Sequence, residues 1–147
     1  MSLHDWLQNG WVAEHQSSRE EIADLLAIVE RDLEDCRTPG LSPAWRLNIA
    51  YNAALQAAAA ALAAEGFRAG REAYHFRVIQ SLAYTLGWDA NLISQLDHFR
   101  KKRNLSGYER AGMTSEQEAD EMFELALRLR DEVIAWLRRR HPRLLGK

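Results

Sequence analysis

The sequence lacks the features of disulfide scaffolds, membrane proteins and polycations. Its single cysteine, Cys36, excludes an intramolecular disulfide framework and a cysteine-based zinc site in this chain of 147 residues. The longest purely apolar run, Ala57 to Ala64, is eight residues, far short of a membrane span. Nineteen Lys and Arg face 21 Asp and Glu, a net charge of −2, which excludes a histone-like polycation. The first residues lack the basic start and apolar block of a signal peptide. We therefore expect a cytoplasmic protein without membrane contact.

Proline and glycine are also scarce, with three and eight residues respectively, so the chain has few points at which regular structure must break. The apolar residues follow helical spacing throughout, without the alternation of strands. This predicts an all-α protein, an antiparallel bundle of about five helices with no sheet. We expect a short amphipathic arm over residues 1–16, one helical domain over 17–141 and a tail over 142–147.

The helix starts carry recognisable caps. Ser17 or Ser18 precedes the first main helix, and Ser42-Pro43 precedes the second. From Ala53 to Ala64 nine of twelve residues are alanine, so close approach of neighbouring helices predicts that this helix is central. A third helix is expected over 71–86 and a fourth after Asp89. The last helix is expected to begin with Thr114 and Gln117, or with Ser115 and Glu118, as the capping pair.

Arg103 interrupts an apolar pattern near the end of the fourth predicted helix. At 3.6 residues per turn it falls in the middle of the stripe formed by Leu92, Leu96 and Phe99. A guanidinium there must find a carboxylate, a carbonyl or a ligand, because an unpaired buried charge is expensive. The alternative is an arginine at a fraying helix end that extends to water. Arg100 and Lys102 flank the stripe, and residues 98–110 hold five Lys and Arg against Glu109 alone, a patch able to contact phosphate.

His75 lies at the centre of another apolar stripe, where a hydrogen-bonded core or interface histidine is more common than a ligand. The other histidines have no i, i+3 or i, i+4 pairing, so a helical metal site has no support. A Gly-rich phosphate loop, a G-x-S-x-G elbow and an H-E-x-x-H motif are all absent. We therefore predict no metal and no cofactor.

At residues 100–108, RKKRNLSGY, the sequence resembles the HEPN superfamily of small all-α bundles in bacterial and archaeal toxin–antitoxin and defence systems. The resemblance covers roughly residues 17–140 and includes LSPAWRLNIAYNAALQAAAAALAAEGFR, the REAYHFRVIQSL segment and the acidic helix that follows RKKRN. It implies an up-and-down helical topology and a homodimer. In ribonuclease members of this superfamily, an arginine and a polar follower are separated by four to six residues from a histidine. Two such motifs meet across the dimer.

Arg103 matches the arginine of that motif, Asn104 the polar follower, and Tyr108 stands where the histidine would be. Tyrosine is a poor general base at neutral pH because its pKa is near 10. The resemblance therefore favours a homodimeric binding module for a nucleotide or RNA, with Arg100, Lys102, Arg103 and His75 as ligand-binding residues. An antitoxin or a nucleotidyltransferase is the implied partner. The alternatives are a metal-independent ribonuclease using Arg103, Asn104 and Tyr108, or a bundle that only binds proteins.

Overall fold

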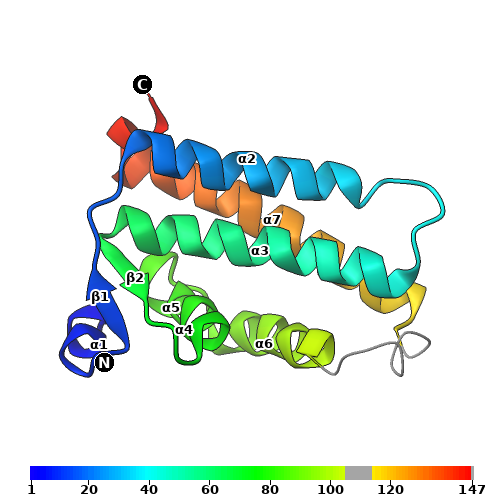
Figure 1. Ribbon diagram of the computed structural model, residues 1–147, viewed down its shortest axis with the longest axis horizontal. Coiled ribbons are helices and arrows are strands. Elements are labelled where there is room, and N and C mark those ends of the chain that lie inside the picture. Colours follow the sequence, from blue (N-terminus) through cyan, green and yellow to red (C-terminus); the bar gives the residue numbers. More distant parts are fainter. Residues whose placement is uncertain (105–113, 147) are drawn as a thin grey trace.

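The computed structural model describes residues 1–104 and 114–146, and most of them are helical (Figure 1). The prediction of a mainly helical bundle is confirmed. Three long helices form one part of the molecule, and shorter elements pack beside them. The elements in chain order are α1 (Leu3–Gln8), β1 (Val12–Glu14), α2 (Arg19–Asp35), α3 (Pro43–Ala64), β2 (Phe67–Ala69), α4 (Tyr74–Gln80), α5 (Leu82–Thr85), α6 (Ala90–Asn104), α7 (Glu116–Arg140) and the 3-10 helix η2 (Pro142–Leu145).

Serine side chains cap the three long helices, as their sequence pattern predicts. Ser18, rather than Ser17, caps α2, and Ser42 caps α3. At α7 the cap is Ser115, and a full capping box forms. The Ser115 hydroxyl accepts from the Glu118 amide at 3.0 Å, while the Glu118 carboxylate accepts from the Ser115 amide at 3.0 Å. These bonds satisfy amide groups that a helix start otherwise leaves unpaired.

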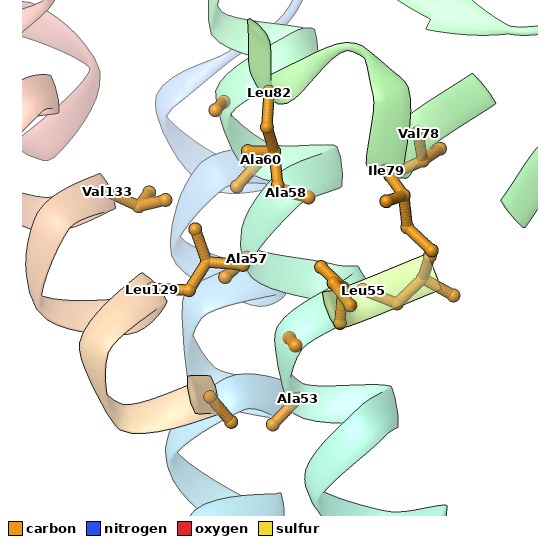
Figure 2. Packing of buried hydrophobic residues seen from close by; sticks show 14 of the residues in the cluster. Ala53, Leu55, Ala57, Ala58, Ala60, Val78, Ile79, Leu82, Leu129 and Val133 are labelled. Atoms are coloured by element: carbon orange, nitrogen blue, oxygen red, sulfur yellow. The ribbon is translucent and has the colours of Figure 1, made fainter. Parts of the chain in front are cut away.

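Helix α3 is the centre of the core, as the alanine-rich segment predicts. Figure 2 shows its Ala57 facing Leu129 of α7, with Val78 and Ile79 of α4 on another side of the helix. The alanines at positions 53, 54, 57, 58, 60 and 61 are completely buried. Methyl side chains allow neighbouring helices to approach closely on several sides. The helix is long and apolar enough to cross a membrane by composition, but 72% of its most apolar window is buried inside the protein. It is therefore a core helix.

Ion pairs at both ends of α3 define the direction of its neighbour α7. Arg46, near the start of α3, donates to Glu116 at 2.9 Å and to Asp120 at 2.6 Å, both at the start of α7. Glu65, just after α3, accepts from Arg140 at 2.8 Å, at the end of α7. The two helices therefore run in the same direction, whereas α2 runs opposite to α3 (Figure 1). The expected alternation of direction holds for α2 and α3 and is wrong for α3 and α7.

The prediction that the protein has no sheet is also wrong. Strand β1 pairs antiparallel with β2, with Val12 opposite Ala69 and Glu14 opposite Phe67. The apolar residues of the expected amphipathic arm over residues 1–16 have helical spacing. However, α1 ends at Gln8, and Gly10 follows with a φ of 77°, a conformation that favours glycine. Three-residue strands are too short to show a recognisable alternation, so periodicity could not reveal them.

The expected third helix, 71–86, begins later and is divided in two. Ala73 precedes α4 in the left-handed region, at a φ of 54°, so the chain cannot continue as helix from Arg71. Ser81 separates α4 from α5, and its hydroxyl donates to the carbonyl of Val78 at 2.6 Å. Serine hydroxyl bonds of this kind compete with regular helix bonding. Helix α6 keeps its predicted start, because Asp89 accepts from the amide of Leu92 at 2.9 Å.

The N-terminal arm is fastened to α4 by an arginine between aromatic rings. The guanidinium carbon of Arg77 lies 3.8 Å from the ring centroid of Trp11 and 5.3 Å from that of Trp6. Trp6 also meets Tyr84 edge to face, with centroids 5.4 Å apart. Each cation–ring contact contributes about 0.5–2 kcal/mol. The arm therefore belongs to the same packed body as the helices.

We predict that Ala58→Leu destabilises the protein by about 1–3 kcal/mol, because the larger side chain overpacks a closed part of the core. Urea unfolding followed by circular dichroism measures the change. Ala27→Leu is the matched control, since Ala27 is exposed on α2. An Ala58→Leu protein as stable as the control would contradict the central position of α3.

Candidate functional site

Three of the four predicted ligand-binding residues gather around Tyr51 of α3. His75 comes from the first turn of α4, and Arg100 and Arg103 come from the last turns of α6. The guanidinium carbon of Arg103 lies 5.3 Å from the centroid of the Tyr51 ring. The stripe that contains Arg103 thus brings this cation to an aromatic face, while the residue itself stays exposed at the helix end. Its exposure agrees with the alternative of an arginine that extends to water from a helix end.

The tyrosine and the histidine form a hydrogen-bonded pair. The Tyr51 hydroxyl lies 2.9 Å from Nδ1 of His75, and the two rings are stacked at 19° with centroids 5.8 Å apart. Tyr51 is completely buried, and in the described chain no buried side-chain nitrogen or oxygen lacks a partner. The prediction of a hydrogen-bonded histidine within an apolar stripe is confirmed.

This pair decides which nitrogen of His75 carries the proton. His75 is the hydrogen-bond partner of the Tyr51 hydroxyl within the described residues. If Nδ1 were the donor, the buried hydroxyl hydrogen would be left without an acceptor, which costs about 1–3 kcal/mol. The hydroxyl therefore donates to Nδ1. In neutral imidazole the proton is then on Nε2, and His75 offers an N–H donor on its outer side.

The electrostatic surroundings keep His75 neutral. Burial lowers the pKa of His75 below its usual value, and the positive charges of Arg103 and Arg100 lower it further. Burial also raises the pKa of Tyr51, so its hydroxyl stays protonated. The site at neutral pH therefore contains two guanidinium groups and one neutral N–H donor.

Arg100 is held in place by a neighbouring carboxylate. Its Nε lies 2.6 Å from Asp97, and its guanidinium lies 5.6 Å from the ring centroid of Phe76. Lys101 also approaches Asp97, at 3.6 Å. Arg100 and Lys101 therefore share the carboxylate of Asp97, while Lys102 pairs with Glu118.

Lys102 is directed elsewhere. Its ammonium group lies 3.1 Å from Glu118, the residue that completes the capping box of α7. This ion pair fastens the end of α6 to the start of α7, which is a structural role. Asn104 is the last residue of α6, and its side chain and the whole of Tyr108 lie outside the described residues.

Sequence reasoning missed Tyr51. The signal was present, because Tyr51 is a large residue with a polar tip in a helix of alanine and leucine, and a buried hydroxyl requires a partner. The partner could not be identified, since His75 lies 24 residues further along the chain.

Neither the single cysteine nor a cluster of metal-ligating side chains in the described chain forms a second candidate site. Burial raises the pKa of Cys36 to about 11, so its sulfur is a protonated, weakly nucleophilic thiol at neutral pH. It borders a cavity of about 450 Å³ together with Arg46, Glu116 and Phe123. Across residues 1–104 and 114–146 no group of three His, Cys, Asp or Glu side chains is placed to hold a metal ion.

Comparison with known proteins gives no relative: no family model, no curated protein and no solved structure matches this chain.

We predict that Arg103→Gln raises the pKa of His75, because one of the two nearby positive charges is removed. Titration of the His75 ring by NMR measures this. Arg139→Gln, at an exposed position near the end of α7, should leave the pKa unchanged. An equal pKa in all three proteins would contradict the electrostatic coupling.

The same coupling affects stability. A histidine whose pKa is lowered on folding binds fewer protons in the native state than in the unfolded chain, so the free energy of unfolding rises with pH up to about 6.5. This slope should be shallower in Arg103→Gln.

Proposed function

We propose that this protein binds a phosphate-bearing ligand, a nucleotide or RNA, through Arg103, Arg100 and His75. The observation that supports this proposal is that two guanidinium groups from α6 and one imidazole N–H donor from α4 converge around the buried Tyr51. Guanidinium groups donate charge-assisted hydrogen bonds to phosphate oxygens. The neutral imidazole adds a donor without further repulsion between cations.

The tautomer of His75 favours binding over catalysis. A general base needs a lone pair facing the substrate, and the lone pair of His75 faces Tyr51 instead. In the motif segment Tyr108 replaces the histidine of HEPN ribonucleases. These two observations support a HEPN-like module that binds its ligand without cleaving it. A ribonuclease that uses Arg103, Asn104 and Tyr108 is the alternative outcome.

The proposal extends to the assembly. We propose a two-fold homodimer in the cytoplasm, with an antitoxin or a nucleotidyltransferase as partner, on the strength of the resemblance over residues 17–140. A second copy would place a further Arg103 beside the first and double the local positive charge. This arrangement suits a polyanion that contacts both chains.

Arg103→Ala should weaken binding of a short single-stranded RNA about 10- to 100-fold, the loss expected for one charge-assisted contact of about 1.5–3 kcal/mol. Fluorescence anisotropy at fixed salt measures the dissociation constant. Arg139→Ala is the matched control, because it removes the same charge at the other end of the molecule. Arg103 lies over Tyr51, and Arg140, the neighbour of Arg139, pairs with Glu65. Tyr51 and Glu65 are about 21 Å apart along α3.

Equal affinity of wild type and Arg103→Ala would refute the site. The RNA is also examined for cleavage on a denaturing gel, and it should stay intact. Cleavage by wild type that is absent in both Arg103→Ala and Tyr108→Phe would establish the ribonuclease instead.

Light scattering at micromolar concentration should give twice the chain mass of 16.8 kDa. The reason is the resemblance to the HEPN superfamily over residues 17–140, which implies a two-fold dimer. A single species at the mass of one chain would contradict the homodimer while leaving the binding site of one subunit intact.

A further inference from the structure

Trp45 is a large aromatic residue that the fold leaves mostly exposed. It lies in the first turn of α3 with 61% of its surface accessible, whereas Trp6, Trp88 and Trp136 are 3%, 5% and 7% accessible. Its backbone amide donates to the hydroxyl of Ser42, the cap of α3, at 3.2 Å. Any residue except proline can make this bond. An exposed indole forgoes the large stabilisation that burial of an aromatic side chain provides. Its side chain is therefore available to a ligand.

Trp45 lies on the same helix as Tyr51, at the end where Arg103 arrives. At 3.6 residues per turn, Asn48 lies about 60° and Trp45 about 120° around α3 from Tyr51, and about 4.5 Å and 9 Å along the axis. Figure 1 shows α2 on one side of α3 and α4 to α6 on the other, with α7 behind. Arg46, adjacent to Trp45, faces α7 through Glu116 and Asp120.

Asn48 lies between the cations and the indole, and its carboxamide is available. It is half-buried and makes no hydrogen bond within the described chain. In the described residues every fully buried polar side-chain atom has a hydrogen-bond partner. Because the amide of Asn48 has none, it must reach solvent. Asn52, one turn further, is different, because its amide donates to Asp32 at 2.7 Å.

From Tyr51 towards the start of α3, the site therefore presents first the phosphate donors beside Tyr51, then the free carboxamide of Asn48 and then the exposed aromatic face of Trp45. A nucleotide carries the complementary groups, since the ribose separates its phosphate from a base that offers both a hydrogen-bonding edge and a stacking face. Base–aromatic stacking is strong and tolerant of sequence, and a carboxamide donates to and accepts from a base edge. The stacking face of a base is accessible in a single strand and hidden in a duplex.

We infer that the ligand is a single-stranded nucleic acid, and that Trp45 stacks on one of its bases while Asn48 contacts the base edge. This rests on the proposed function, because the phosphate is held by Arg100, Arg103 and His75. Inorganic phosphate or duplex RNA would use only the charged part of the site.

The experiment compares two ligands of equal charge, a short single-stranded oligoribonucleotide and an abasic oligonucleotide of the same length. Wild type should bind the base-bearing strand about tenfold or more tightly, the preference that one stacked base provides. Trp45→Leu should remove this preference and leave the abasic affinity unchanged. Trp45→Phe should retain most of it. Tyr84→Leu is the matched control, at an exposed aromatic residue of α5.

The outcomes separate the two proposals. Arg103→Ala should weaken both ligands, which tests the phosphate site independently of Trp45. An unchanged preference in Trp45→Leu, or duplex RNA that binds as tightly as the single strand, would overturn the stacking inference and leave the phosphate site standing. If neither oligonucleotide binds to wild type, both proposals fail. Far-UV circular dichroism verifies that the variants keep their helix content, which is expected because Trp45 is exposed.

Discussion

The close packing around α3 is the constraint on which the rest of the structure depends. A helix whose side chains are mostly methyl groups can be approached on several sides at once, and α2, α7 and the α4–α6 segment all use that freedom. Methyl side chains alone do little to distinguish one direction of a neighbouring helix from the other. At the two ends of α3, charged side chains make this distinction: Arg46 pairs with the start of α7, and Glu65 pairs with its end. Small residues thus permit the contact, and the ion pairs fit the parallel direction.

The candidate site is built around an exception to the small side chains of α3. Tyr51 is the residue of α3 whose size and hydroxyl cannot be accommodated by alanine packing alone, and the hydroxyl is satisfied by His75. Once Nδ1 of His75 is occupied, the remaining nitrogen of the neutral ring must be a donor, and burial together with the nearby arginines lowers the pKa of the ring. A core requirement, the satisfaction of a buried hydroxyl, therefore determines the chemical character of a surface group. This is the basis on which we propose binding of an anion rather than proton abstraction.

Several features could be predicted because they depend on neighbours within one or two helical turns. The caps at Ser42 and Asp89, the capping box of Ser115 and Glu118, and the central alanine-rich helix all follow from local spacing. The role of Arg103 was predicted only in part. Its position on an apolar stripe was visible, but its approach to the Tyr51 ring depends on the packing of α6 against α3. The site residue that was missed, Tyr51, required the same long-range knowledge.

The sequence by itself determined the helical class, the helix starts at Ser42, Asp89 and Ser115, and the positions at which polar residues interrupt apolar stripes, because these depend on backbone propensity and on a period of 3.6 residues. The tertiary structure alone decided the shared direction of α3 and α7, the pairing of β1 with β2 and the tautomer of His75. Each of these depends on groups that are distant in the chain, such as Arg46 and Glu116, Val12 and Ala69, or Tyr51 and His75. Contacts of this kind are selected by the fit of whole elements to one another, and local spacing carries no information about that fit.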